Sequence, residues 1–275
     1  MTLHCGRYTL SLECPLIMGV VNLTDDSFSG DGLAGDAARA IEHGLRLKEE
    51  GADILDIGGE SSRPGAQPVP VEMELARVVP VVAGLRDCGL PLSVDTLKPA
   101  VMAAALAAGA DMINDIAALR MPGALEALAA SKAAVCLMHM QGEPGNMQRD
   151  PHYADVVAEV AAFLAERVAA CEAAGIVRER IVVDPGFGFG KTLDHNLALL
   201  RHLPELVPPG VPLLAGMSRK SMLGQITGRP VGERLAAGIA AHLLAIQRGA
   251  RIIRVHDVAA LRDALAVLNA VEEKL

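Results

Sequence analysis

Five side chains of this 275-residue chain have the chemistry of a site for a phosphate-like anion. Arg63, Arg254 and His256 each follow a short apolar run, and the planar guanidinium of arginine binds phosphate oxygens in pairs. Ser61 and Ser62, in the segment GGESSRPG, add hydroxyl donors. Scattered arginines usually face solvent, but these stand beside Gly, Ser and Pro at the ends of predicted strands. They therefore predict a phosphate site.

A second group of polar residues supplies hydrogen-bond acceptors. Asp95, Asn114 and Asp184 each end an apolar run, and a carboxylate there suits a ligand edge with paired N–H groups, such as a 2-aminopyrimidine. Asn22 also ends such a run. An asparagine in this position is usually a turn or capping residue, but beside acidic Asp26 its carbonyl oxygen also suits Mg²⁺. The two groups together indicate a flat nitrogen heterocycle attached to a phosphate.

The chain has only four phenylalanines and no tryptophan, and three of the four stand in segments that follow predicted strands. Phe28, Phe187 and Phe189 are therefore interpreted as apolar walls for a flat ligand. The last two belong to DPGFGFGKT (184–192), which differs from a phosphate-binding P-loop because Pro185 replaces the first glycine. An ordinary glycine-rich turn is the alternative interpretation.

Composition argues against several classes of protein. A net charge of −8 is unlike that of a general nucleic-acid binder, and no apolar block reaches the length of a membrane span. The eight histidines form neither HxH nor HExxH, which argues against the usual zinc sites, and His139 is interpreted as a packed residue. The first residues show no secretory pattern, and five cysteines without a CxxC pair are typical of reduced thiols in the cytoplasm.

Short apolar runs that alternate with Ala- and Leu-rich stretches predict the elements that position these side chains. The expected strands span residues 16–21, 53–57, 91–94, 111–114, 134–138, 181–184, 212–216 and 251–255. The expected helices span residues 35–50, 71–86, 98–108, 122–130, 153–174, 194–201, 232–248 and 258–272. Eight strands separated by helices match an α/β fold of the (β/α)8 TIM-barrel type, and a doubly wound open sheet is the alternative.

No linker rich in glycine, serine or charge divides the chain, so residues 1–275 are expected to form a single domain. Residues 3–14 are expected to form a short β-hairpin that covers the bottom of the barrel. In a barrel the carboxyl ends of all strands meet on one face. The polar residues that follow the strands therefore predict one funnel-shaped site.

Eight segments occur in a fixed order between about residue 16 and residue 270, namely MGVVNLTDDSFSGDG, DILDIGGESSRPGA, SVDTLKP, MINDI, CLMHMQG, DPGFGFGK, GMSRKS and IIRVHDV. This series resembles the motif series of the dihydropteroate synthase family. The resemblance implies a barrel, usually a homodimer, that condenses 6-hydroxymethyl-7,8-dihydropterin pyrophosphate with p-aminobenzoate. It also implies release of pyrophosphate, a requirement for Mg²⁺, and inhibition by sulfonamides.

The resemblance implies roles for the residues at the matching positions. The pterin would be held by Asp95, Asn114, Asp184 and Lys220, and would pack near Ile116, Met138, Phe189 and Arg254. The pyrophosphate would be held by Asn22, Ser62, Arg63, Arg254 and His256, with Asn22 also binding the metal. The p-aminobenzoate pocket would include Phe28, Ser61, Ser62, Pro64, Phe189 and Ser218. Among these, the catalytic set would be Asn22, Arg63, Asp95, Asp184, Lys220, Arg254 and His256.

Two positions depart from the family pattern. Asp25 stands where the family usually has proline, and Ser62 where it has threonine; activity is expected to survive both changes. The alternatives are a related pterin-binding barrel that passes methyl groups to a cobalamin protein, and a non-catalytic pterin-binding paralogue. Arg63, Arg254 and His256 disfavour both, because all three residues suited to a diphosphate are present.

Overall fold

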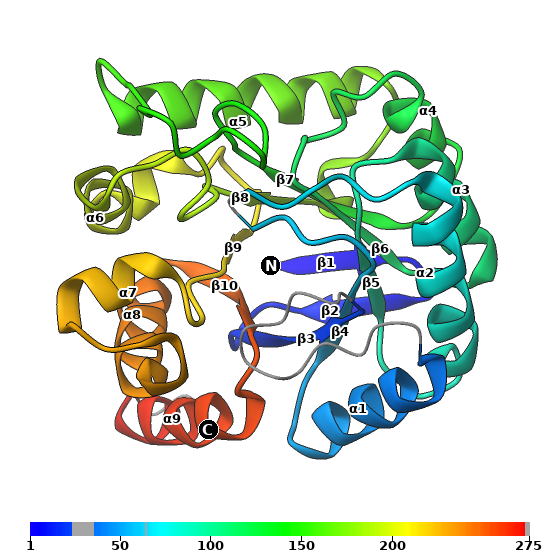
Figure 1. Ribbon diagram of the computed structural model, residues 1–275, viewed down its shortest axis with the longest axis horizontal. Helices are drawn as coiled ribbons and strands as arrows, with labels where there is room; N and C mark the ends of the chain where they lie inside the picture. Colours follow the sequence, from blue (N-terminus) through cyan, green and yellow to red (C-terminus); the bar gives the residue numbers. More distant parts are fainter. Residues whose placement is uncertain (24–35, 64, 273–275) are drawn as a thin grey trace.

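The computed structural model describes residues 1–23, 36–63 and 65–272. Within these ranges, eight parallel strands close into a barrel in the order β10-β3-β4-β5-β6-β7-β8-β9, surrounded by helices (Figure 1). The strands are β3 (Leu16–Asn22), β4 (Ile54–Gly58), β5 (Leu92–Asp95), β6 (Met112–Asp115), β7 (Ala134–Met138), β8 (Ile181–Asp184), β9 (Leu213–Ala215) and β10 (Ala250–Val255). This closed barrel confirms the predicted fold class and excludes the doubly wound sheet.

The core has two layers because successive strand residues face opposite sides of the sheet. In β4, Leu55 and Ile57 pack outward with Val78 and Val82 of the covering helix. Ile54 faces the interior, where it packs with the inward residues of other strands. Toward the carboxyl ends of the strands, the inward positions change from apolar to polar residues, which prepares that end of the barrel for a ligand.

The covering helices follow the strands in sequence and form a ring around the barrel (Figure 1). They are α1 (Ala37–Glu49), α2 (Val71–Leu85), α3 (Pro99–Ala108), α4 (Ala124–Ala129), α5 (Val156–Ala173), α6 (Leu193–Arg201), α7 (Ser221–Thr227), α8 (Leu235–Gln247) and α9 (Val258–Val271). Local chemistry explains several helix starts. Asp36 caps α1, Asp155 caps α5, and Thr192 forms a capping box with His195 at α6.

The predicted hairpin is present as β1 (Thr2–Cys5) and β2 (Tyr8–Ser11), and β1 lies at the centre of the ring of strands in Figure 1. Leu3 and Leu12 pack against Met18 and other residues in the lower barrel interior, so the hairpin closes that end. Arg7 secures it. Its Nε and Nη2 atoms donate to the two Asp111 carboxylate oxygens, each at 2.9 Å.

All eight predicted strands and all eight predicted helices are present, with ends within three residues of the expected ones. Helix α7 was not predicted, because its seven residues, SMLGQIT, are too few to show a helical period. None of the helices in the described part of the chain is long and apolar enough to cross a membrane.

Candidate functional site

A cavity of about 370 Å³ opens at the carboxyl end of the barrel. Most of the residues predicted from sequence line it, namely Asn22, Ser61, Ser62, Arg63, Asp95, Asn114, Ile116, Met138, Asp184, Phe189, Ser218, Lys220, Arg254 and His256. These residues come from different strands and the segments that follow them, and the barrel brings them together as expected. Two other predicted residues, Phe28 and Pro64, lie outside the described residues, and a third, Phe187, does not line the cavity.

Arg254 crosses the barrel interior and links the acidic residues of two other strands. Its Nε donates to Asp56 Oδ2 at 2.5 Å, and its Nη2 donates to Asp95 Oδ2 at 3.0 Å. Acidic and basic groups of the site are therefore in direct contact. An arginine on the inward face of β10 reaches β4 and β5 because its side chain is long enough to span the interior.

Burial shifts the charge states of the polar groups in this layer. The pKa of the Asp95 carboxyl is raised to about 7 by burial, which outweighs the opposing effect of Arg254 and is reinforced by the charge of Asp56. Burial also raises the pKa of Asp184, and it lowers the pKa of the Lys220 ammonium to about 8. The site therefore exposes its ligand to groups that titrate near neutral pH.

Phe189 of the β8–α6 segment lies against Lys220, which directly precedes α7. The Lys220 Nζ atom lies 4.3 Å from the centroid of the Phe189 ring and donates to the Phe187 carbonyl. Gly186 has a φ of +67°, and a Cβ atom there would lie 2.0 Å from the His139 carbonyl oxygen, so the turn requires glycine. Phe187 is fully buried in the layer between strands and helices. Its interpretation as a ligand wall was therefore wrong.

The buried side chain of Lys191 holds the same β8–α6 segment in place through hydrogen bonds. The Lys191 Nζ atom donates to the carbonyl oxygens of Phe189, at 2.9 Å, and His139, at 3.3 Å, and lies 2.9 Å from His139 Nδ1. His139 is buried and packs edge-on against Phe163, which confirms that it is a packed residue. Burial lowers its pKa to about 3, so its ring is neutral. Lys191 had no role predicted from the sequence.

The anion-binding half of the cavity includes the segment after β4, which carries Ser61, Ser62 and Arg63. Lys98 holds the base of this segment, since its Nζ forms ion pairs with Glu60 and with buried Glu74 and donates to the Val69 carbonyl. Glu60 also lines the cavity and was missed, because a glutamate in a polar loop is usually a solvated residue.

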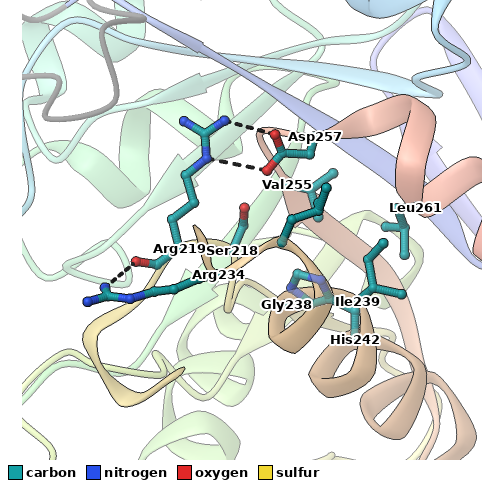
Figure 2. Close-up of a pocket in the computed structure, with 10 residues that line it drawn as sticks. Ser218, Arg219, Arg234, Gly238, Ile239, His242, Val255, Asp257 and Leu261 are labelled. Carbon is teal, nitrogen blue, oxygen red and sulfur yellow. Dashed lines mark hydrogen bonds and ion pairs between the residues drawn. The ribbon is translucent and has the colours of Figure 1, made fainter. Parts of the chain in front are cut away.

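The turn before α7 presents Ser218 and Lys220 to the cavity, and Figure 2 shows how its other face is held. Ser218 Oγ lies 3.0 Å from His256 Nδ1. Arg219 also lines the cavity, has a left-handed φ of +61° and pairs with Asp257, with Nη2 to Oδ1 at 2.9 Å. The Arg234 guanidinium donates to the Arg219 carbonyl at 3.0 Å, as Figure 2 also shows. The turn is therefore fixed before any ligand binds.

An apolar wall completes the cavity. Ile116, Met138 and Met147 are buried and pack together, with Phe189 against them. Met147 was missed, because it comes from a long segment between β7 and α5 that has no apolar period. A wall of methionine, isoleucine and phenylalanine beside carboxylates suits a flat ring that carries N–H groups at its edge.

Asn22 is the residue that could hold Mg²⁺. A Cβ atom at Gly58 would lie 4.0 Å from both Asn22 Oδ1 and Asp95 Oδ2, so both oxygens lie beside the carboxyl end of β4. Among the described residues, no group of three or more His, Cys, Asp or Glu side chains could hold a metal by itself. The Asn22 oxygen fits Mg²⁺, because this ion usually binds few protein oxygens together with substrate phosphates.

The fold and cavity define a (β/α)8-barrel enzyme with a site for a flat heterocycle and a phosphate group. Residues 18–256 match the family described as "Pterin binding enzyme". The dihydropteroate synthase of Neisseria meningitidis serogroup C is 54% identical over 272 residues, which cover 97% of this chain and 96% of that protein. The chain belongs to the dihydropteroate synthase family, whose members are transferases.

Solved structures agree with this assignment. The crystal structure of Burkholderia cenocepacia dihydropteroate synthase complexed with 7,8-dihydropteroate superposes with a TM-score of 0.92 at 53% identity, covering 99% of this chain and 97% of that one. The Yersinia pestis dihydropteroate synthase, in a complex with a sulfonamide drug, superposes with a TM-score of 0.95 at 46% identity over the full length of both chains.

Proposed function

We infer that this chain condenses 6-hydroxymethyl-7,8-dihydropterin pyrophosphate with p-aminobenzoate to give 7,8-dihydropteroate and pyrophosphate, a step of folate biosynthesis. The observation that carries the inference is one cavity in which Asp95 and the buried side chains of Asp184 and Asn114 lie beside Arg63 and His256. One cavity with both kinds of group suits a heterocycle joined to a diphosphate. Family membership supports the same reaction.

We propose that the pterin lies on the apolar wall with its N–H edge toward the acidic residues. Asp95, Asp184 and the Asn114 carbonyl accept hydrogen bonds from the ring, and the Lys220 ammonium donates to it. Ile116, Met138, Phe189 and the Arg254 guanidinium enclose the ring faces. As the bond to the leaving group breaks, the ring gains positive charge, and the Asp95 and Asp184 carboxylates stabilise it.

Ser62, Arg63, Arg254 and His256 bind the pyrophosphate and neutralise its growing charge as it leaves. We also propose that Asn22 Oδ1 holds Mg²⁺ together with the pyrophosphate oxygens. When bound, the ion withdraws charge from the leaving group. The donor set supports this assignment, because Asn22 offers a neutral oxygen at the rim of the anion-binding half of the cavity.

We propose that p-aminobenzoate enters between Ser61, Ser62, Ser218 and Phe189, with Phe28 and Pro64 contributing from segments outside the described residues. Its arylamine is neutral at pH 7 and attacks without a strong base, so no nucleophilic side chain is assigned. Sulfonamides share the aniline ring of this substrate, and we propose that they compete for the same place. The sulfonamide complex of the Yersinia pestis relative supports this assignment.

The test is pyrophosphate release, measured with each substrate omitted in turn. Release is expected only when the pterin pyrophosphate, p-aminobenzoate and Mg²⁺ are all present. Arg254→Ala should abolish it, whereas Arg251→Ala, a matched change at the far end of the same strand, should leave the rate unchanged. Unchanged turnover in Arg254→Ala would remove the anion-site assignment. Release without p-aminobenzoate would indicate a hydrolase instead.

We further propose that the protein is a cytoplasmic homodimer that binds neither nucleic acid nor membranes. Large apolar side chains on α8 and α9 are exposed to solvent, namely Leu235, Leu244, Val267 and Val271, and burying them would favour self-association. All five cysteines are free, which suits a reducing compartment. Light scattering should give a mass near twice that of the 28.7 kDa chain, and a monomer at micromolar concentration would refute the dimer.

A further inference from the structure

A buried carboxylate beneath the cavity, Asp56, contacts two residues of the proposed pterin site. Asp56 lies on the inward face of β4 and its side chain has no exposed surface. Its Oδ2 atom accepts hydrogen bonds from Arg254 Nε, at 2.5 Å, and from Asn114 Nδ2, at 3.2 Å. Asp56 does not line the cavity itself. Its hydrogen bonds reach the site through Arg254 and Asn114.

The contact with Asn114 fixes which end of the amide meets the ligand. A carboxylate accepts hydrogen bonds and cannot donate them, so the amide group that faces Asp56 must be the NH₂ group. The Asn114 carbonyl oxygen then remains for a ligand in the cavity. With a neutral or donating side chain at position 56, the amide could rotate and present its NH₂ group, which would repel a ring N–H.

The contact with Arg254 fixes the plane of the guanidinium. Asp56 binds Nε and Asp95 binds Nη2, so the guanidinium is held by two carboxylates from adjacent strands. A buried charge is stable only when it is paired, and two partners give Arg254 one orientation rather than several. The second oxygen of Asp56, Oδ1, is buried and has no hydrogen-bond partner in the described part of the chain. A buried oxygen without a hydrogen-bond partner lowers the stability of the fold, so its retention indicates that Asp56 has a functional role.

We propose that Asp56 is a positioning residue for the pterin, which sets the acceptor face of Asn114 and the orientation of Arg254. The inference rests on the proposed function, since it needs Asn114 and Arg254 to contact a pterin. The ligand concerned is the same 2-amino-4-oxopterin ring. Asp56 affects the affinity for this ring and not the affinity for p-aminobenzoate.

The experiment measures binding of 6-hydroxymethylpterin to the full chain by calorimetry. Asp56→Asn keeps the shape of the side chain and removes its charge, and we expect the dissociation constant to rise at least tenfold. The matched control is Ser93→Ala, since Ser93 pairs with Asp56 in the strand register, is equally buried and makes no hydrogen bond within the described residues. This control should bind within twofold of the unmodified chain.

Coupling separates a positioning role from a structural one. Asn114→Ala alone should weaken binding at least tenfold, but in the Asp56→Asn background it should weaken binding less than threefold further, because the amide is already misdirected. If the two substitutions instead weaken binding by independent factors that multiply, the proposal is overturned. In steady-state assays, Asp56→Asn should raise KM for the pterin substrate at least tenfold and leave KM for p-aminobenzoate within threefold. Equal rises in both would indicate a general distortion and would also overturn it.

A second variant is available if Asp56→Asn does not fold. The exchanged pair, Asp56→Asn with Asn114→Asp, keeps one carboxylate and one amide and reverses the direction of their hydrogen bond. It should bind 6-hydroxymethylpterin at least tenfold more tightly than Asn114→Asp alone, and no improvement would refute the proposal. If the unmodified chain does not bind the pterin, or if Asn114→Ala has no effect, the proposed function fails. If both behave as expected and Asp56→Asn binds normally, only this inference fails.

Discussion

The raised pKa of Asp95 predicts that ionisation of this carboxyl lowers the free energy of unfolding. An aspartate in an unfolded chain has a pKa near 3.8, and burial raises that of Asp95 to about 7. The folded chain therefore holds a proton on Asp95 more tightly than the unfolded chain does. Above pH 4 the unfolded state releases this proton first, so stability falls as the pH rises toward 7.

The magnitude follows from the size of the shift. A difference of about 3 pKa units corresponds to about 4 kcal/mol between low pH and pH 8, at 1.36 kcal/mol per unit. Between pH 5 and pH 8 the expected loss is about 3 kcal/mol, because the folded-state proton leaves at about pH 7. Asp95→Asn removes the titration and keeps the shape. The advantage of the variant over the unmodified chain should therefore grow by about 3 kcal/mol between pH 5 and pH 8.

Urea unfolding of both chains at pH 5 and pH 8 measures this difference, and other titrating groups cancel in the comparison. Asp87→Asn is the control, because it removes an exposed carboxylate that follows α2 and does not line the cavity. The reasoning is refuted if the advantage of Asp95→Asn falls between pH 5 and pH 8, or if it is independent of pH. The same variant should lose binding of 6-hydroxymethylpterin, because an amide replaces an ionised acceptor.

Three further predictions concern other parts of the molecule. Because burial lowers the pKa of Lys220 to about 8, pterin affinity should fall as the pH rises through 8, and Lys220→Met should abolish this dependence, measured by calorimetry from pH 6.5 to 9.5. Asn22→Ala should raise the Mg²⁺ concentration needed for half-maximal pyrophosphate release severalfold, whereas an unchanged requirement would exclude Asn22 as the ligand. Asp111→Ala should lower the unfolding free energy by about 3 kcal/mol in urea titrations, because it leaves the buried Leu92 N–H unpaired and releases Arg7.

Most of the fold and much of the site follow from local patterns. Parallel strands are apolar on both faces, so runs such as LIMGVV and AVCLM are distinct from the amphipathic helices between them. Residues such as Asn22 and Asp184 could be placed in the site because each ends a strand, where barrels gather their ligand-binding groups. Their convergence depends only on the closed topology.

The residues that were missed act through contacts between distant segments. Asp56 lies in the middle of DILDI, and its sequence neighbours do not reveal that Arg254, 198 residues later, will reach its carboxylate. Lys191 follows a glycine-rich turn, and its role depends on carbonyl oxygens that only the folded turn brings together. Phe187 was assigned to the ligand, although it packs in the core. Phe187 and Phe189 are separated by one residue, yet Phe187 packs between strands and helices and Phe189 lines the cavity. The sequence alone does not indicate which of the two contacts the ligand.

The strand that closes the barrel also completes the site, and this has a consequence for synthesis of the chain. Asp56 and Asp95 leave the ribosome early, whereas Arg254 lies on β10, which pairs with both β9 and β3. Until β10 has emerged, Arg254 cannot pair with the two carboxylates, so hydration is their more stable state. A nascent chain that ends before residue 254 is therefore expected to keep its upper interior hydrated. Pterin binding can begin only once the last strand has joined the first.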